Sequence, residues 1–394
     1  MKYADRIKKM KASEIRELLK ITQHPEIISF AGGLPSPDSF PVDIIKKISD
    51  KILKEHGPQA LQYGPTEGIG ELRSTIVRRL RKEGIKCYED EVMITSGSQQ
   101  VLSLTAEIFL NPKDYVVIES PTYIGALVAF NAYQPKYIHV SMDDNGMIIS
   151  ELERKLRGIK KSKIDFIYTV PTFQNPSGIT MSLERRKQLL EIAEKHDLMI
   201  LEDDAYSNLR YSGKCVPSIK SLDKNRRVIY THTLSKSLAP GFRLGYVVAE
   251  REKLRKMAIA KQGADLCGNI FVQYIANEYI KSGLIDKQEY KIIKMYRKKR
   301  DIMLKALEKH FPKGCKWTHP DGGMFIWVTV PSKIDTRDLF VDAIHEKVAF
   351  VHGAAFRVDG KGHNTMRLNF SNTDDKKIEV GIKRLGNLIK KKMK

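Results

Sequence analysis

The sequence predicts an α/β protein in which a mostly parallel sheet lies between layers of helices. Short apolar runs of strand length recur through the middle of the chain, and segments with helical periodicity, such as residues 183–197, separate them. This alternation is typical of parallel strands joined by helical crossovers, which place helices on both faces of the sheet. The expected strands are residues 92–95, 115–120, 165–170, 198–204, 227–233 and 243–249.

The chain of 394 residues is long enough for a second, smaller domain. After about residue 285 the pattern changes to a long basic helical segment, followed by strand-like runs interleaved with helices. We therefore expect a large domain over residues 46–284 and a small α+β domain made of residues 285–394 with residues 1–45. The strand-like runs of the small domain are MFIWVTV (324–330), VAFVHG (348–353) and TMRLNF (365–370).

The composition indicates an ordinary globular protein, with 42% hydrophobic and 29% charged residues. No apolar run approaches the length of a membrane span, and the first twenty residues are charged and helical rather than a secretory signal. We therefore expect a cytoplasmic protein. The cysteines form no CxxC pair and have no histidine pair nearby, so we expect reduced thiols and no metal site. They are Cys87, Cys215, Cys267 and Cys315.

The chain is strongly basic, with 68 Lys and Arg against 47 Asp and Glu, a formal net charge of +21. This excess raises nucleic acid as a partner, but no zinc finger, RNP-type aromatic motif or evident helix-turn-helix accompanies it. The positive residues are spread over helical faces and the C-terminal LIKKKMK. We interpret them as a solvated surface that also steers anionic substrates toward a cleft, and we expect neither nucleic acid nor membrane as a partner.

Ligands of open α/β sheets bind beyond the carboxyl ends of the strands, so residues at these positions are candidates for a site. The run TSGSQQ follows the first expected strand and leads into a helical pattern. Its backbone N–H groups suit a phosphate, and a plain N-cap at Ser98 explains the same pattern about as well. The GxGxxG pattern of dinucleotide-binding domains does not accompany it.

Aromatic, amide and acidic side chains follow the next three strands. Tyr123 lies in PTY after the second strand, and Asn175 lies in PTFQNPSG, a loop that its prolines and glycine make sharp. The acids Asp203 and Asp204 end the fourth strand, with Tyr206 just beyond. The two acids are alternatively N-caps or metal ligands, although the sequence offers no partners for a metal site. Each of these features alone is ordinary loop chemistry.

The stretch TLSKSLAPGFRLG (233–245) places one lysine among small residues. Lys236 is the only lysine or arginine between Arg227 and Arg243 in an otherwise lysine-rich chain. A phosphate nest, an aromatic face, an amide, a carboxylate and an isolated lysine at successive strand ends match the needs of pyridoxal 5′-phosphate. A second amine there would compete for the aldehyde of this cofactor, which explains the isolation of Lys236.

Taken in order, these motifs resemble those of the fold-type I pyridoxal-phosphate-dependent aminotransferases of class I/II. The chain is most similar to the branch that acts on 2-aminoadipate and aromatic amino acids, the LysN- and kynurenine-aminotransferase-like enzymes. The resemblance runs through nearly the whole chain and implies an aspartate-aminotransferase-like fold. The motifs are ASEIRELLK, SFAGGLPSPDSFP, QYGPTEG, TSGSQQ, SPTY, PTFQNPSG, EDDAY, SKSLAPGFRLG, KQGADL, GGMFIWV and TMRLNF.

The resemblance implies that Lys236 is the catalytic residue, which forms the Schiff base with the cofactor and moves the proton of the substrate Cα. Burial and nearby cations are expected to lower its pKa from the usual value of about 10.4. Asp203 is expected to keep the pyridine nitrogen protonated. Asp204, one place further along the strand, is expected to face the other way.

The remaining cofactor contacts follow from the same resemblance. Tyr206 and Asn175 are expected to hydrogen-bond the phenolic oxygen, and Tyr123 to stack on the ring. Tyr63 in QYGPTEG resembles the tyrosine that reaches the phosphate from the neighbouring subunit, which implies a homodimer; simple dimer packing is the alternative. Arg243 pairs with the phosphate or anchors its own turn. The full phosphate set is Ser98, Gln99, Ser235 and Arg243.

Substrate contacts are implied for Arg367, Asn175, Gly33 and Arg16. Arg367 resembles the arginine that binds the substrate α-carboxylate with two hydrogen bonds, and a structural ion pair is the alternative. Gly33 is expected to let the backbone approach the substrate. An N-terminal helix over the site would present Arg16 to acidic side chains and Ile15, Leu18 or Leu19 to apolar ones. Alternatively, Arg16 faces solvent and pairs with a glutamate, worth about 0–1 kcal/mol.

These assignments predict ping-pong transfer of an amino group from an amino acid to a 2-oxo acid, with 2-oxoglutarate as the expected acceptor. The expected donors are glutamate or 2-aminoadipate together with leucine-type and aromatic amino acids. A β-lyase or decarboxylase of the same fold is the alternative, disfavoured by the pattern around Arg367. A transcription regulator built on this fold would carry a DNA-binding domain before SFAGGLP, which begins at residue 29, so we disfavour it.

Overall fold

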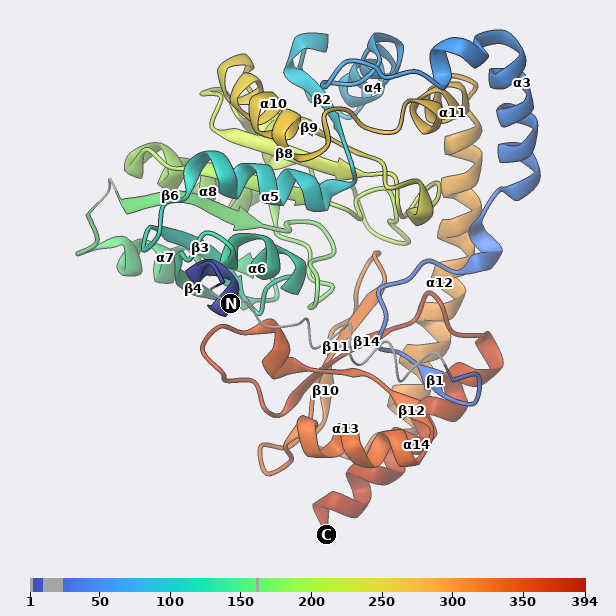
Figure 1. Cartoon of the computed structure of the whole chain (residues 1–394). Coiled ribbons are helices and arrows are strands. Elements are labelled where there is room, and N and C mark those ends of the chain that lie inside the picture. Colours follow the sequence, from blue (N-terminus) through green and yellow to red (C-terminus); the bar gives the residue numbers. More distant parts are fainter. Residues whose placement is uncertain (1–2, 10–23, 161–162) are drawn as a thin grey trace.

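The computed structural model describes residues 3–9, 24–160 and 163–394 (Figure 1). In that view the larger sheet and its helices lie above a smaller sheet, and the long helix α12 (Leu284–His310) extends from the upper layer to the lower one. No helix within these three ranges is long and apolar enough to cross a membrane. The expected Arg16 and its neighbours in the N-terminal motif lie outside the described residues.

The described residues form one sheet of eight strands in the order β2-β9-β8-β7-β6-β3-β4-β5. The central pairs β4–β3, β3–β6, β6–β7 and β7–β8 are parallel, whereas β9 runs antiparallel to both of its neighbours. The mostly parallel sheet that the sequence predicts is thereby confirmed. The strands are β2 (Val92–Thr95), β3 (Tyr115–Ser120), β4 (Lys136–Asp143), β5 (Gly146–Met147), β6 (Ile164–Thr169), β7 (Met199–Asp204), β8 (Val228–Thr233) and β9 (Gly245–Val248).

The sixth expected strand, residues 243–249, is shorter than predicted and begins at Gly245. Arg243 precedes it with a φ of 50°, in the left-handed region, and ends the short 3-10 helix Pro240–Phe242. Because this backbone conformation cannot continue into a strand, the chain turns at Arg243. The turn brings the guanidinium of Arg243 to the carboxyl end of β8 instead of into the sheet.

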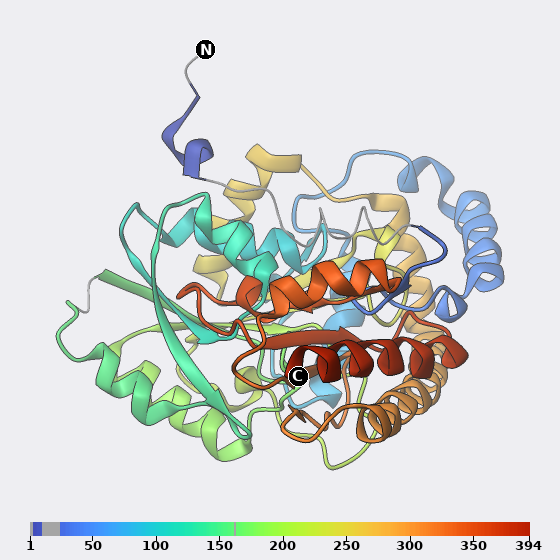
Figure 2. The ribbon, with the colours of Figure 1, turned by 90° about the horizontal axis from the view of Figure 1, so that it is seen from below.

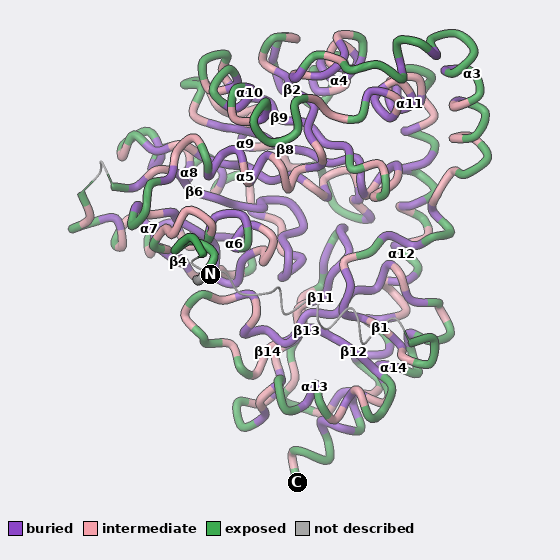
Figure 3. Tube along the Cα trace, viewed as in Figure 1, coloured by how far each residue is buried: buried purple, intermediate pink, exposed green. Residues whose placement is uncertain are grey.

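Helices cover both faces of the large sheet, and their apolar residues bury the strands (Figure 3). One apolar cluster joins the sheet to α5, α6 and α10, and another joins it to α7, α8 and α9. Helices α3, α4 and α11 pack around the β2 and β9 edge. These helices are α3 (Val42–Ala60), α4 (Gly70–Lys82), α5 (Ser98–Phe109), α6 (Ile124–Asn131), α7 (Ile149–Leu156), α8 (Leu183–His196), α9 (Ile219–Leu222), α10 (Arg251–Asp265) and α11 (Ile270–Lys281).

The C-terminal part contains a four-stranded antiparallel sheet among the described residues, in the order β10-β11-β14-β13. Seen from below, α13 and α14 lie across this part (Figure 2). Strand β1 pairs with β12, so the segment around residue 28 packs with the C-terminal part; the domain boundaries themselves stay a prediction. The elements are α1 (Asp5–Lys9), β1 (Ile28–Ser29), β10 (Lys316–Trp317), β11 (Phe325–Thr329), α13 (Thr336–His345), β12 (Val348–Ala349), β13 (Val351–His352), β14 (Thr365–Asn369) and α14 (Asp375–Met393).

Candidate active site

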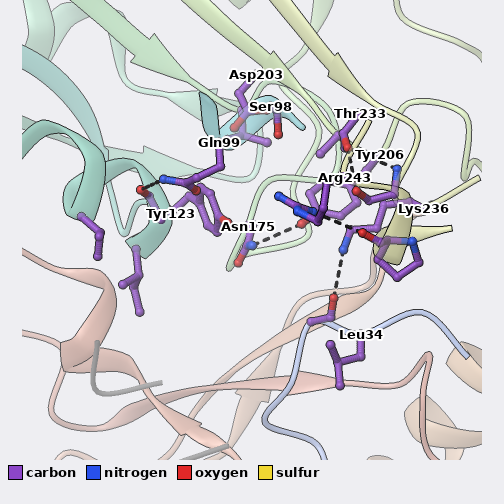
Figure 4. A pocket seen from close by; sticks show the side chains of 18 of the residues that line it. Leu34, Ser98, Gln99, Tyr123, Asn175, Asp203, Tyr206, Thr233, Lys236 and Arg243 are labelled. Carbon is purple, nitrogen blue, oxygen red and sulfur yellow. Dashed lines mark hydrogen bonds between the residues drawn. The ribbon is translucent and has the colours of Figure 1, made fainter. Parts of the chain in front are cut away.

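A cavity of about 760 Å³ opens where the parallel strands of the large sheet end (Figure 4). Tyr123 follows β3, Val170 follows β6, Asp203 is the last residue but one of β7 and Thr233 ends β8, so neighbouring strand ends converge on one space. The complete lining is Gly33, Leu34, Ser98, Gln99, Tyr123, Ile124, Gly125, Val128, Val170, Asn175, Asp203, Ala205, Tyr206, Thr233, Ser235, Lys236, Pro240, Arg243 and Arg367.

Most of the residues singled out in the sequence meet in this cavity. Tyr63 does not line it: its side chain is 78% exposed, in the segment that joins α3 to α4. Arg16 lies outside the described residues. The predicted residues that line the cavity are Gly33, Ser98, Gln99, Tyr123, Asn175, Asp203, Tyr206, Ser235, Lys236, Arg243 and Arg367.

Lys236 follows β8, lines the cavity and is partly buried. Its Nζ donates a hydrogen bond of 3.0 Å to the backbone carbonyl of Gly33, which comes from the N-terminal segment. Burial lowers the pKa of the Lys236 amine to about 8, and the positive charges of Arg243 and Arg367 act in the same direction. At pH 7 roughly a tenth of this amine is therefore uncharged and nucleophilic, far more than for an ordinary lysine.

The two acids at the end of β7 point to opposite sides of the sheet. Asp203 lines the cavity, and its Oδ2 accepts a 2.9 Å hydrogen bond from the Tyr168 hydroxyl behind it. Asp204 is absent from the lining and accepts hydrogen bonds from Ser207 N at 3.0 Å and from the Tyr230 hydroxyl at 2.8 Å. Burial raises the pKa of Asp203 to about 7, although the hydrogen bond from Tyr168 lowers it.

Asn175 links two other side chains of the site. Its Nδ2 donates to the Tyr206 hydroxyl at 3.2 Å, and its Oδ1 accepts a 2.9 Å hydrogen bond from Arg367 Nη1. Arg367 on β14 also donates to the carbonyl of Ala31 at 2.7 Å. The network therefore joins the ends of the large sheet to the small sheet and to the N-terminal segment, around one side of the cavity.

The guanidinium of Arg367 is held between two aromatic rings. Its Cζ lies 4.3 Å from the ring centroid of Phe325 and 4.9 Å from that of Phe356. Such stacking fixes the plane of a guanidinium and suits it to bind a carboxylate with two hydrogen bonds. Burial lowers the pKa of Arg367 to about 10, so that the group still carries its charge at neutral pH.

The start of α5 and the turn at Arg243 form a cradle for an anion. No side chain among the described residues caps the first turn of α5, which leaves backbone N–H groups at its N-terminus. A Cβ on Gly97 would lie 2.9 Å from Nη2 of Arg243, and a Cβ on Gly245 would lie 2.9 Å from the amide nitrogen of Ser98. Only glycine at these two positions lets the cation and the helix start approach each other.

The motif KQGADL supports this cradle from the side. Lys261 is fully buried, and its Nζ lies 2.5 Å from Oδ1 of Asp265. The other carboxylate oxygen of Asp265 accepts hydrogen bonds from Gln100 Nε2 at 2.8 Å and Ser96 Oγ at 3.2 Å. These contacts hold the loop before α5 in place.

Several residues of the site carry no signal in the sequence. Leu34, Ile124 and Val128 form an apolar part of the lining, and the latter two are one helical turn apart on α6. Tyr168 touches Asp203 from β6 without lining the cavity. In the sequence, an apolar or tyrosine side chain within an apolar run is indistinguishable from an ordinary core residue. Only the three-dimensional contacts show that these residues belong to the site.

The polar groups of the cavity fit pyridoxal 5′-phosphate. Oδ1 of Asp203 is buried and accepts no hydrogen bond from any described residue, which leaves it free for a protonated ring nitrogen. The glycine-lined cradle at Arg243 fits the phosphate, and the Lys236 amine is in the same cavity to bond the aldehyde. The donor set therefore matches each end of the cofactor.

Comparison with known proteins gives consistent matches over the whole chain. The family model described as aminotransferase class I and II matches residues 26–385. The chain is 50% identical over 388 residues to aromatic-amino-acid aminotransferase 1 of Thermococcus litoralis, covering 98% of this chain and 93% of that protein.

Two solved structures share the fold. A kynurenine aminotransferase from Pyrococcus horikoshii, in complex with PMP, KYN as substrates and KYA as products, superimposes with a TM-score of 0.96. It is 49% identical, with 100% of this chain and 98% of that chain covered. LysN, the α-aminoadipate aminotransferase of Thermus thermophilus, complexed with N-(5′-phosphopyridoxyl)-L-leucine, gives 0.92 at 37% identity, covering 99% and 98%. The resemblance and the fold predicted from the motifs are confirmed.

Proposed function

Since this chain belongs to the class I and II aminotransferases, we propose that it transfers the amino group of an acidic, a large apolar or an aromatic amino acid to 2-oxoglutarate. The observation that carries the proposal is the meeting of Lys236 and Asp203 in one cavity with a buried arginine, Arg367. An amine with a lowered pKa, a buried carboxylate and a fixed guanidinium are the groups that amino transfer requires.

We propose pyridoxal 5′-phosphate as the cofactor. When bound, it supplies an aldehyde that bonds amines and a ring that withdraws electrons from the substrate Cα. Asp203 binds the protonated ring nitrogen, while Tyr206 and Asn175 donate hydrogen bonds to the phenolic oxygen. Tyr123 stacks on the ring. The phosphate is bound by Ser98, Gln99, Ser235 and Arg243.

Lys236 acts as the base and acid of the reaction. With the cofactor bound, the free amine of Lys236 would take the proton from the substrate Cα. The same nitrogen would then hold this proton and return it at the reactive carbon of the cofactor. A pKa lowered to about 8 suits both steps, because the group must be neutral to accept the proton and must then release it.

Arg367 orients the substrate by its α-carboxylate. The two flanking rings hold the guanidinium, and the hydrogen bonds to Asn175 and Ala31 fix its ends. Gly33 leaves room for the backbone beside the substrate, where an added Cβ would lie 3.2 Å from the Phe325 ring. Both the donor and the acceptor carry this carboxylate, so one arginine serves both halves of the reaction.

The side chain of the substrate meets two kinds of surface. The apolar wall of Leu34, Ile124 and Val128 fits leucine-type and aromatic side chains. The cations among the described residues of the cavity, Lys236, Arg243 and Arg367, have other roles, so recognition of an acidic side chain falls to Arg16. The 2-oxoglutarate acceptor presents the same γ-carboxylate as glutamate and uses the same cation.

The active unit is a homodimer in this proposal. Tyr63 is 78% exposed and lies near other exposed apolar side chains, Leu61 at 72% and Leu266 at 53%. The loops that carry them are joined, because the Thr66 hydroxyl donates to the carbonyl of Leu266 at 2.8 Å. A second copy covering this surface buries these side chains and carries Tyr63 to the phosphate of its neighbour.

A panel of amino donors with 2-oxoglutarate tests the proposal, and formation of glutamate is the readout. The donors include 2-aminoadipate, leucine, phenylalanine and kynurenine. When glutamate is the donor, 2-oxoadipate replaces 2-oxoglutarate as the acceptor. We expect turnover with acidic and with large apolar or aromatic donors, and little with glycine or lysine. Release of ammonia or carbon dioxide without formation of the new amino acid would indicate a lyase or decarboxylase and contradict the proposal.

A further inference from the structure

Tyr168 contacts the key carboxylate of the site from outside the cavity. It lies on β6, is fully buried, and donates its hydroxyl to Oδ2 of Asp203 at 2.9 Å. In the parallel register Tyr168 lies opposite Leu201, so its side chain shares a face of the sheet with Asp203, two residues further on. The ring of Phe130 packs against it edge-on, with centroids 5.5 Å apart, and holds the phenol in this place.

The two carboxylate oxygens of Asp203 therefore differ in their hydrogen bonding. Oδ2 is held by the Tyr168 hydroxyl, whereas Oδ1 is buried and accepts no hydrogen bond within the described part of the chain. A carboxylate anchored through one oxygen cannot rotate freely about its own axis, and the position of the other oxygen is fixed with it. A buried acceptor without a partner is costly, and such an atom indicates a ligand group that binds there.

We propose that Tyr168 is a positioning residue that holds the Asp203 carboxylate, ionised and correctly turned, for the ring nitrogen of the cofactor. The inference rests on the proposed function and deepens it, because it assigns to a residue outside the cavity a part in binding the ring. Tyr168 acts through Asp203 and touches neither the cofactor nor the substrate.

The electrostatics of the carboxyl group support this role. Burial raises the pKa of Asp203 to about 7 and the neighbouring charge of Asp204 acts in the same direction, while the hydrogen bond from Tyr168 lowers it. Without the phenol, the carboxyl group would be protonated over more of the neutral pH range. A protonated carboxyl group cannot pair with a protonated ring nitrogen, so loss of the phenol weakens the bond to the ring.

The chain provides a matched control on the other side of β7. Tyr230 on β8 is also buried and donates its hydroxyl to Oδ2 of Asp204 at 2.8 Å. It lies opposite Glu202, two residues before the acid that it contacts, as Tyr168 lies opposite Leu201. Replacing either tyrosine by phenylalanine removes one hydroxyl from one buried carboxylate, but only Asp203 lines the cavity.

The test measures affinity rather than turnover. The full-length chain, freed of cofactor, is titrated in a calorimeter with pyridoxamine 5′-phosphate and with its 1-deaza analogue, in which C–H replaces the ring nitrogen. We expect Tyr168→Phe to raise the Kd of pyridoxamine 5′-phosphate about tenfold, the loss of one hydrogen bond to a charged group. The Kd of the deaza analogue should change less than about twofold, and Tyr230→Phe should leave both values near wild type.

A second arm uses Asp203→Asn as the background. If Tyr168 acts through Asp203, adding Tyr168→Phe to this variant should cause no further loss of affinity for pyridoxamine 5′-phosphate. If Tyr168→Phe raised both Kd values by the same factor, or changed neither, the inference would be overturned. Tyr168 would then be a packing residue. Failure of the wild-type chain to bind pyridoxamine 5′-phosphate would instead remove the proposed function, and the inference with it.

Discussion

Strand β7 ends in two adjacent acids that differ in their hydrogen-bond partners and in the side of the sheet that they face. Both are buried, Asp203 with 3% and Asp204 with 5% of its surface exposed. Asp204 has a hydrogen-bond donor on each oxygen, Ser207 N on one and the Tyr230 hydroxyl on the other. Asp203 has a donor on one oxygen only among the described residues, and it faces the cavity. The role that we propose for Asp203 alone therefore rests on its unsatisfied oxygen and not on its burial.

A raised pKa of a buried carboxyl group does not distinguish a site residue from a structural one. Burial also raises the pKa of Glu119 and of Glu202 to about 7. Glu119 is hydrogen-bonded by Thr169, Val170 N and Gln174, and Glu202 by the backbone N–H groups of residues 219 and 220. Carboxylates such as these stabilise the ends of the sheet, whereas Asp203 retains a free oxygen for a ligand.

The largest effect is expected from exchanging the two acids for asparagine separately. Asp203→Asn should lower kcat/KM by about 10²–10³-fold, the usual cost of removing one stabilising group from a reacting centre. Asp204→Asn should cost less than about tenfold in activity. It should instead lower the free energy of unfolding by roughly 1–3 kcal/mol, because one amide oxygen cannot serve both the Ser207 and the Tyr230 donors.

Steady-state kinetics and denaturant unfolding of both variants provide the measurement. The reverse ranking in activity would mean that Asp204 faces the cofactor and that the sheet is oriented differently from our description.

A second prediction concerns the residue proposed to recognise acidic substrates in the cavity that Asp203 faces. Arg16→Ala should lower kcat/KM for 2-aminoadipate and glutamate more than for leucine and phenylalanine, because a charged hydrogen bond worth about 1.5–3 kcal/mol is lost only for acidic donors. The expected difference between the two classes is roughly tenfold to a hundredfold. Equal losses for both classes, or none for either, would place Arg16 away from the substrate.

The pKa of Lys236 gives a prediction about pH. Only the neutral amine attacks the aldehyde, and burial lowers its pKa to about 8, so the rate of attachment of pyridoxal 5′-phosphate to the cofactor-free chain should rise about tenfold per pH unit below 8. The rate should level off above about pH 9. Stopped-flow absorbance between about pH 6.5 and pH 11 measures it. A rise that continues to pH 10.5 would mean that the amine keeps its ordinary pKa.

The smallest expected signal comes from the neighbouring subunit. Heterodimers of Lys236→Ala and Tyr63→Phe subunits place both lesions in one site and leave the other intact if Tyr63 crosses the interface. Activity should then recover to about half of the wild-type value, provided that the Tyr63→Phe homodimer is strongly impaired. Verified heterodimers with no recovery would show that Tyr63 acts within its own subunit. Each active site would then be formed by residues of one chain.

The fold and much of the cavity could be predicted from the sequence, because both depend on local patterns. Alternating strands and helices indicate a parallel sheet, and the ends of parallel strands lie together, so Asp203, Asn175 and Lys236 were expected to be neighbours. The family motifs then connected them with Arg367, which lies on a different sheet. Arg16 and Tyr63 remain predictions, since one lies outside the described residues and the other needs a second chain.

The contacts behind the cavity could not be predicted. Tyr168 reaches Asp203 only because β6 and β7 pair in a particular register, and Arg367 is flanked by Phe325 and Phe356 from separate parts of the chain. The sequence placed Arg243 at the start of a strand, with a turn anchor as one of its possible roles, and only the structure shows that its left-handed φ ends the preceding turn. Register and long-range packing leave no periodic trace in the sequence.

The central claim is that Lys236 bonds a cofactor that Asp203 holds in the same cavity. Reduction of the holoenzyme with borohydride, followed by proteolysis and mass spectrometry, tests it most directly, because reduction makes the bond between lysine and cofactor permanent. We expect a phosphopyridoxyl group on the peptide that contains Lys236, and no such label in the Lys236→Ala chain. A label on another lysine, or an unlabelled Lys236 peptide from active protein, would contradict the account.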